Sequence, residues 1–435
     1  MHFFHYCDGQ LHCEDVDLEH VADKIGTPTY VYSAGTILDH YARMDSALAP
    51  LDHLICYAVK ANSNCAILKL LADAGAGFDI VSGGELFRVL TAGGDPAKCT
   101  FAGVGKSRDE IEYALEQGVY SFNVESESEL ELIDRVAAAK NLRAPIALRV
   151  NPDVDPHTHQ YISTGSQENK FGIALDQVRA VYERAARMSN IEIIGVQMHI
   201  GSQITEAKPF ASAIEKVAPL VRDLKSKYGI KFFSIGGGMG IIYQRALGSG
   251  SGKWWHDHGG EPSAFSVGDY AEAIVPPLRD LGIRILVEPG RFLIGNAGVL
   301  LTRVCYLKQT GSKKFAIVDA GMNDLIRPAL YQSYHEIVPS KQPKTERERK
   351  ISKIDIVGPV CESGDFFALG REMPEVHEGD LLAIMSAGAY GFVMASNYNS
   401  RPLPAEALVR GDKFALIRTR QTSEELVRGE VDAGL

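Results

Sequence analysis

A single lysine stands where a strand-like run of the sequence ends. Residues 54–59 are mostly apolar and β-prone, Lys60 follows directly, and residues 62–64 (NSN) are turn-forming. A lysine in this position lies at the rim of a sheet, and an amine partly removed from water is more often neutral and able to attack carbonyl carbons. The plainer alternative is a solvated lysine that closes a strand. Motifs elsewhere in the chain favour the chemical interpretation.

Three such motifs follow other strand-like runs. His199 lies in MHIGSQ, Gly236 to Gly240 form GGGMG, and Glu288 to Arg291 form EPGR. Glycine-rich turns after the last strands of a barrel hold phosphate groups on backbone N–H groups. A reactive lysine together with a phosphate site predicts pyridoxal 5'-phosphate, with His199 stacked on its ring and Glu288 paired with the ring nitrogen. Singly, each motif has a simpler alternative, such as a flexible turn or a core histidine.

These motifs need strands that all end on one side of a sheet. Eight short aliphatic runs look buried on both faces, as parallel strands are. The predicted strands cover 54–58, 78–81, 99–102, 120–124, 146–150, 193–198, 232–235 and 284–287. Helix starts with capping-box spacing occur between them at Ser82, Ser107 and Ser126. This alternation predicts a (β/α)8 barrel rather than an open doubly wound sheet, because no strand is followed by GxGxxG.

Beyond about residue 290 the pattern changes to strands with little helical periodicity. The predicted strands here cover 299–307, 314–320, 351–359, 381–387 and 413–419. With the β-like pieces at the start of the chain they predict a second domain, of β-barrel or sandwich type. The expected domains are therefore a barrel over 34–290 and a discontinuous β domain over 1–33 and 291–435. The Gly- and Ser-rich segment 245–268 is predicted to be a long loop after the seventh strand.

Composition narrows the class of protein. The chain has 435 residues, a formal charge of -10 and no basic tract, which argues against a nucleic-acid partner. No apolar run is long enough for a bilayer, and the N-terminus lacks the apolar core of a signal peptide. Seven scattered cysteines fit a reducing cytoplasm. We therefore expect a cytoplasmic enzyme that acts on a small molecule, without a membrane partner or a metal site.

Several motifs together resemble those of the fold-type III, pyridoxal-phosphate-dependent amino-acid decarboxylases, and most closely the members that act on diaminopimelate. They span most of the chain in the expected order. The matching pieces are YAVKAN (57–62), HIGSQ (199–203), GGG (236–238), EPGR (288–291), MNDLIRPALY (322–331), GPVCESGD (358–365) and AGAYGFVMASNYN (387–399).

The resemblance implies an alanine-racemase-like barrel with a β domain, working as a homodimer with shared active sites. It assigns Lys60 as the Schiff-base lysine, and Cys361 as the acid that protonates the α-carbon. The implied cofactor-binding residues are Lys60, His199, Ser202, Gly237, Gly238, Gly240, Glu288, Gly290, Arg291 and Tyr390. The implied substrate-binding residues are Arg291, Arg327, Tyr331, Glu362 and Tyr390. Each site would take Cys361 and Glu362 from the partner subunit.

Arg327 decides the expected substrate. Its guanidinium binds a carboxylate through two parallel hydrogen bonds, and diaminopimelate carries a second carboxylate at its far end. The expected reaction is decarboxylation of meso-diaminopimelate to L-lysine and carbon dioxide. The alternatives are a related decarboxylase acting on ornithine, arginine or carboxynorspermidine, and a non-catalytic carrier of the cofactor. A carrier would be a short single barrel, so the β domain and the CESGD motif count against it.

Overall fold

The computed structural model describes residues 2–154, 170–259, 264–343 and 350–434. The chain divides into two compact units. One comprises Leu38–Ile241 and His258–Leu293, and we refer to it as the barrel unit. The other comprises Met1–Ile37, Ile242–Asp257 and Ile294–Leu435, and we refer to it as the β unit. Each unit is described separately below.

The barrel unit is a closed ring of parallel strands. The last strand of the ring pairs with the first, and the fourth pairs with the fifth. The strands are β5 (His53–Ala58), β6 (Gly77–Ile80), β7 (Cys99–Phe101), β8 (Ser121–Val124), β9 (Ala144–Asn151), β11 (Ile191–Met198), β12 (Phe232–Ser234) and β13 (Arg284–Val287). A short strand, β10 (Ile173–Ala174), adds to β9. Because parallel strands all end on the same side, the segments that follow them meet around one mouth.

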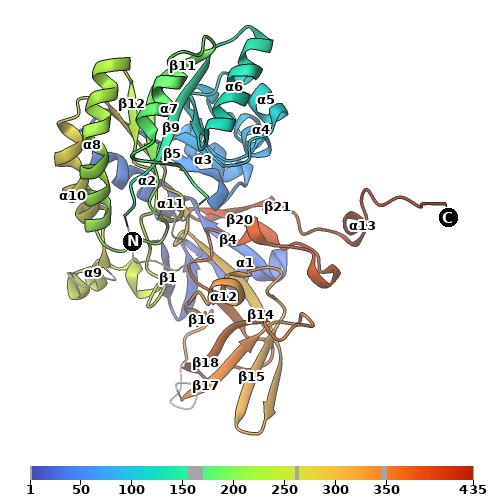
Figure 1. Ribbon diagram of the computed structural model, residues 1–435. Helices are drawn as coiled ribbons and strands as arrows, with labels where there is room; N and C mark the ends of the chain where they lie inside the picture. The colour runs from blue at the N-terminus through green and yellow to red at the C-terminus, as the bar shows by residue number, and fades with distance from the viewer. Residues whose placement is uncertain (1, 155–169, 260–263, 344–349, 435) are drawn as a thin grey trace. The chain divides into compact units, whose positions relative to one another are not determined.

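Helices surround this ring (Figure 1). Those wholly or mostly in the unit are α2 (Ala34–Leu48), α3 (Cys65–Asp73), α4 (Gly83–Thr91), α5 (Arg108–Gln117), α6 (Glu127–Lys140), α7 (Val178–Ala185), α8 (Lys208–Tyr228), α10 (Val267–Arg279) and α11 (Arg291–Ile294). Ser82, Ser107 and Ser126 are the N-caps of α4, α5 and α6, as the capping spacing predicts. Among these three helices the reciprocal capping box forms at Ser107 alone, because the glutamates of α4 and α6 bond to the residue before the cap.

The β unit contains a mixed sheet in the order β18-β17-β15-β14-β4-β20-β21, with β19 paired to β14 and β16 paired to β19. Its strands are β4 (Thr29–Ser33), β14 (Gly298–Thr310), β15 (Lys313–Val318), β16 (Ile337–Pro339), β17 (Ile351–Val357), β18 (Phe366–Pro374), β19 (Leu381–Ile384), β20 (Ala405–Arg410) and β21 (Lys413–Arg418). A separate small sheet joins β1 (Phe4–Cys7), β2 (Gln10–Cys13) and β3 (Val16–Asp17). The helices of this unit are α1 (Leu18–Ile25), α9 (Gly252–His258), α12 (Arg327–Tyr331) and α13 (Ser423–Leu426).

The prediction of a (β/α)8 barrel with a separate β domain is confirmed. Some element predictions are wrong in detail. The run 381–387 was expected to be one strand, but β19 ends at Ile384 because Ser386 has a φ of 57°, which a strand cannot accommodate. Segment 245–268 is not one long loop, because α9 forms within it, and residues 260–263 of that segment lie outside the described residues. The predicted domain boundaries at 34 and 290 stay a prediction; residues 242–257 group with the β unit.

Candidate active site

Lys60 lies in the single turn (Val59–Ala61) that follows β5. The pairing of β5 with β6 places Asp79 opposite Ala58, and the Lys60 amine contacts the Asp79 carboxylate at 2.5 Å. Asp79 is fully buried, whereas the Lys60 side chain is 40% exposed. The amine is therefore held by a buried charge, while part of the Lys60 side chain is exposed. This is the geometry expected for an amine that must meet a ligand at the barrel mouth.

Glu288 directly follows β13 and is buried. It accepts a hydrogen bond from the Ser234 hydroxyl at 2.6 Å and one from the Gln197 amide at 3.0 Å. Burial, with a smaller contribution from the negative charge of Asp79, raises the pKa of Glu288 to about 7. A proton on this carboxyl group, or a positive partner beside it, is therefore favoured near neutral pH. A pyridine nitrogen that carries a proton is such a partner.

His199 directly follows β11 and is held in one tautomer. The Gly237 N–H donates to its Nδ1 at 3.2 Å, so Nδ1 is the acceptor and Nε2 carries the hydrogen. Burial lowers the pKa of His199 well below its ordinary value, and the positive charges of Arg149 and Lys60 lower it further. The imidazole is therefore neutral at physiological pH. The charge of Lys60 acts on both His199 and Glu288, so the structure brings these three predicted residues to one place.

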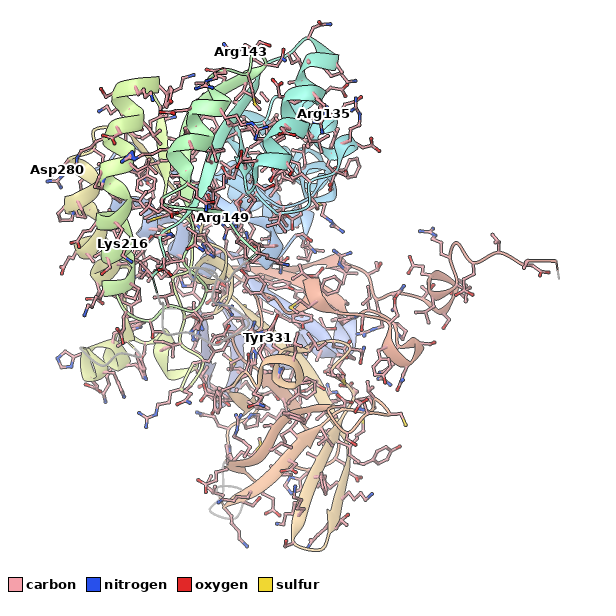
Figure 2. All side chains as sticks on the ribbon, viewed as in Figure 1. Arg135, Arg143, Arg149, Lys216, Asp280 and Tyr331 are labelled. Carbon is pink, nitrogen blue, oxygen red and sulfur yellow. The ribbon has the colours of Figure 1, made fainter. Side chains whose placement is uncertain are left out.

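Arg149 provides the second positive charge of this mouth. It lies on β9 (Figure 2), pairs with the buried carboxylate of Glu125 at 2.7 Å, and stacks over the Phe171 ring at 4.7 Å. The Glu125 carboxylate also accepts the Gly172 N–H at 2.8 Å. A buried ion pair with these additional contacts has a fixed orientation, so its guanidinium is a constant neighbour of His199 rather than a mobile charge.

The glycines after β12 allow three strand-end loops to pack backbone against backbone. A Cβ on Gly237 would lie 2.1 Å from the Glu288 carbonyl oxygen, and one on Gly238 would lie 2.5 Å from the Gly201 carbonyl oxygen. The Glu288 N–H also donates to the Gly236 carbonyl at 2.8 Å. Side chains at these positions would separate the loops, so the sequence GGG is required by this close approach.

The same loops bring donors suited to a phosphate. Arg291, at the start of α11, donates from Nη2 to the Ser202 Oγ at 3.1 Å. Gly240 packs against Ile204, and Gly290 packs against Ala58 and Ala61. A guanidinium and a hydroxyl are donors that bind phosphate monoesters in proteins, and a glycine-rich turn lets the backbone approach such a group closely. With the buried Asp79 Oδ1, which has no hydrogen-bond donor among the described residues, the barrel unit fits pyridoxal phosphate chemically.

In the β unit, Arg327 begins α12 and is buried. Its Nη2 donates to the Ser333 hydroxyl at 3.2 Å and to the Tyr243 hydroxyl at 3.3 Å. Its guanidinium lies over the rings of Tyr243 and Tyr331, at 5.6 and 5.7 Å from their centroids. Tyr331 is labelled on α12 in Figure 2. The two rings and two hydroxyls fix the plane of the guanidinium, as recognition of a carboxylate requires.

Cys361 and Glu362 lie on the turn between β17 and β18, and both are exposed. Asp365 anchors this turn, because its carboxylate accepts the N–H groups of Met322 and Val360, each at 2.6 Å. The Cys361 N–H donates to the Asn399 side chain at 2.8 Å. The turn is thus rigid in its backbone while its two predicted functional side chains face outward. Tyr390, also in this unit, has a φ of 56°.

Two buried residues of the barrel mouth were missed by the sequence analysis. Asp79 and Arg149 are charged residues inside apolar strand-like runs, FDIV and IALRV. A charge at such a position is rarely buried unless it is paired, so this was the available signal. Their partners, Lys60 and Glu125, follow two other strands, β5 and β8, and only the pairing of the barrel strands identifies them.

Comparisons with known proteins agree with this geometry. Residues 34–295 match the family model for the pyridoxal-binding domain of pyridoxal-dependent decarboxylases. The chain is 52% identical to diaminopimelate decarboxylase of Pseudomonas aeruginosa, over 99% of both chains. A diaminopimelate decarboxylase of Helicobacter pylori solved with L-lysine has a TM-score of 0.86 and 40% identity, over 95% of this chain and 98% of that one. The enzyme of M. jannaschii has a TM-score of 0.90 and 36% identity, over 100% and 99%.

The described helices include none that combines the length and the apolar character needed to cross a membrane. The resemblance read from the motifs is confirmed by relatives that match over nearly the whole chain, and the predicted cofactor is confirmed with it. The chain belongs to the diaminopimelate decarboxylase family of pyridoxal-dependent decarboxylases.

Proposed function

We propose that the protein decarboxylates meso-diaminopimelate to L-lysine and carbon dioxide with pyridoxal 5'-phosphate as cofactor. The observation that carries this proposal is the meeting of Lys60, His199 and Glu288 at one barrel mouth, in a chain that matches diaminopimelate decarboxylases end to end. When bound, the cofactor supplies an electron-poor ring that accepts the electron pair left by the departing carboxylate.

The barrel residues bind and orient this group. Lys60 provides the amine that carries the cofactor, with Asp79 as the buried charge that holds the amine in place. His199 presents a neutral ring face, so it would stack on the cofactor without adding a positive charge. Glu288 would pair with the ring nitrogen, and its raised pKa favours a shared proton there. We assign the phosphate to Ser202, Gly237, Gly238, Gly240, Gly290 and Arg291.

The β-unit residues select the substrate and return a proton. Arg327 binds the distal carboxylate through its fixed guanidinium, and Glu362 binds the distal amine. The Cys361 thiol donates the proton that the α-carbon needs after carbon dioxide has left. Tyr331 and Tyr390 contact the substrate, as does Arg291, and Tyr390 also contacts the cofactor. Ornithine and lysine end in a cation alone, which a buried guanidinium at this position would repel.

We also propose that the protein works in the cytoplasm as a homodimer whose sites are shared, so that Lys60 of one subunit works with the partner subunit's Cys361 and Glu362. The exposure of Cys361 and Glu362 on a rigid turn supports this arrangement. The domain boundaries 34–290, and 1–33 with 291–435, belong to the same proposal.

An assay of product formation tests the proposed function. Purified protein with added pyridoxal phosphate is given meso-diaminopimelate, ornithine or arginine in separate reactions, and carbon dioxide and the amine product are measured. We expect L-lysine from diaminopimelate and little turnover of the other two. Equal or faster turnover of ornithine or arginine would contradict the proposed substrate, and no turnover of any would contradict the proposed activity.

A further inference from the structure

The glycine turn assigned to the phosphate has little in its own sequence to hold its shape. Residues 236–240 include four glycines, and Gly236 and Gly238 have φ values of 73° and 113°. A glycine-rich segment samples many backbone conformations when nothing outside it restricts them. A binding loop that is not ordered in advance binds its ligand more weakly, because part of the binding free energy is spent on ordering the loop. Some neighbouring group must therefore fix this turn.

Gln203 contacts the turn where it leads into Ile241. Its side-chain Nε2 donates to the Ile241 carbonyl at 2.7 Å, and its Oε1 accepts the Ile241 N–H at 3.2 Å. Both ends of one amide side chain thus bond to both backbone groups of one residue. A carboxylate cannot reproduce this pair of bonds, because it has no donor, and an apolar side chain reproduces neither.

The residue after Gln203 extends the same connection. The Ile204 N–H donates to the Gly238 carbonyl at 2.9 Å, and the Gly240 N–H donates to the Ile204 carbonyl at 2.8 Å. These bonds form an isolated parallel bridge between Ile204 and Met239. The segment after β11 is therefore joined to the glycine turn by two backbone bonds and two side-chain bonds, with Gln203 supplying the second pair.

The backbone conformation of Gln203 indicates that a glutamine is needed at this position for its side chain. Its φ is 58°, a left-handed conformation that is disfavoured for residues other than glycine and asparagine. Glycine would adopt this conformation without strain but would lose both side-chain bonds, and asparagine has a shorter side chain. Ser202, the neighbouring residue, accepts a hydrogen bond from Arg291 at 3.1 Å, so Gln203 also fixes the backbone beside the predicted phosphate-binding hydroxyl.

We propose that Gln203 is a positioning residue for the phosphate group of the cofactor: its amide fixes the glycine turn 236–240 against the Ser202 loop before the cofactor arrives. This inference rests on the proposed function, because it takes the phosphate to bind at that turn. Gln203 itself need not touch the phosphate. The effect of losing it should therefore fall on affinity for the phosphate and not on the chemistry at Lys60.

The test compares two ligands that differ only in the phosphate. Cofactor-free protein is titrated with pyridoxal 5'-phosphate and with pyridoxal. The Kd for pyridoxal divided by the Kd for pyridoxal 5'-phosphate measures the contribution of the phosphate to affinity. Gln203→Met keeps the length of the side chain and removes both bonds, and Gln203→Gly removes the side chain while relieving the backbone. We expect the ratio to fall about tenfold in both variants, the size typical of losing bonds that order a binding loop.

Gln117→Met, at a half-buried position of α5, is the matched control and should leave the ratio unchanged. An unchanged ratio in either Gln203 variant would overturn the inference, and so would an equal loss of affinity for both ligands, which indicates general damage. A wild-type protein that binds pyridoxal as tightly as its phosphate would contradict the proposed phosphate site as well. The wild-type product assay reports separately on the proposed activity, so the two failures are distinguishable.

Discussion

The barrel mouth and the CESGD turn of the β unit differ in how their predicted functional side chains are supported. At the barrel mouth Glu288 is buried and Asp79 fully so, and the charge of Asp79 contributes to the raised pKa of Glu288. On the turn, Cys361 and Glu362 are exposed, and only the backbone beneath them is anchored, through the buried Asp365. The first region has its charges in place before any ligand arrives. In the second region, the side chains of Cys361 and Glu362 become surrounded by protein only when another surface covers the turn.

This difference indicates a division of labour. Buried carboxylates are suited to binding and tuning a permanent cofactor, because low-dielectric surroundings strengthen each interaction. Exposed side chains on a rigid turn are suited to a surface that completes another site. The predictions below begin with the largest expected effect, and the last test addresses the two regions together.

Lys60→Ala should abolish lysine formation, because no other group of the barrel mouth is assigned to carry the cofactor. Reduction of the wild-type holoenzyme with borohydride, followed by peptide mass spectrometry, should place the cofactor on Lys60. Lys69→Ala, an exposed lysine on α3, is the control and should retain wild-type activity. Cofactor found on a lysine other than Lys60 would end this assignment.

Arg327→Lys should lower kcat/KM for meso-diaminopimelate by roughly 30- to 5,000-fold. The change keeps a positive charge but loses the planar pair of donors, and breaking a buried charge-assisted contact costs about 2–5 kcal/mol. The absorbance of the bound cofactor should not change, because Arg327 is assigned to the distal carboxylate of the substrate and not to the cofactor. Arg410→Lys, at an exposed position of β20, is the control. Near-native efficiency of Arg327→Lys would show that the distal carboxylate is bound elsewhere.

Glu85→Gln should change the pH dependence of stability. Burial raises the pKa of Glu85 from 4.5 to about 7, so the folded protein binds this proton more tightly than the unfolded chain does. The resulting stabilisation is full below about pH 4.5 and is lost as the pH rises through about 7. From pH 5 to pH 8 the wild type should therefore lose unfolding free energy relative to Glu85→Gln, by at most about 3 kcal/mol.

The comparison is made on the cofactor-free proteins by urea unfolding at several pH values. The Gln side chain can still accept the Val81 N–H that Glu85 accepts at 2.8 Å, so the local bond is kept. Glu215→Gln, at an exposed position of α8, is the control, and its unfolding free energy should change with pH in parallel with that of the wild type. Parallel curves for Glu85→Gln and the wild type would contradict the raised pKa.

Much of the barrel was predictable because its strands are short apolar runs bounded by polar turns. Lys60, His199 and Glu288 each follow such a run directly, so their common position follows from strand polarity alone. The charged partners Asp79 and Arg149 were not predicted, since their pairing depends on which strands become neighbours. The role of Gln203 was not predicted either, because it depends on a contact with a residue on another strand-end loop.

The β unit was less predictable for a related reason. Strand β18 carries FFALGREMP, in which buried and exposed residues do not alternate regularly, and it was not predicted. The short helix α9 was missed because its sequence, GKWWHDH, shows no apolar periodicity, yet Trp254 packs against Gly248 and Trp255 donates from Nε1 to the Ser249 carbonyl at 2.8 Å. Contacts with residues outside the element itself therefore decide these elements more than the local pattern does.

The most direct test of the contrast between the two regions is complementation between Lys60→Ala and Cys361→Ala. Each variant alone should be nearly inactive, the second by roughly 10²- to 10⁴-fold if the thiol is the proton donor. Unfolding and remixing equal amounts would give about half mixed dimers, each with one doubly altered site and one intact site, so activity should return to about a quarter of wild type. If each site lies within one chain, every site keeps one lesion. No recovery, with subunit exchange confirmed by mass spectrometry, would contradict the shared site.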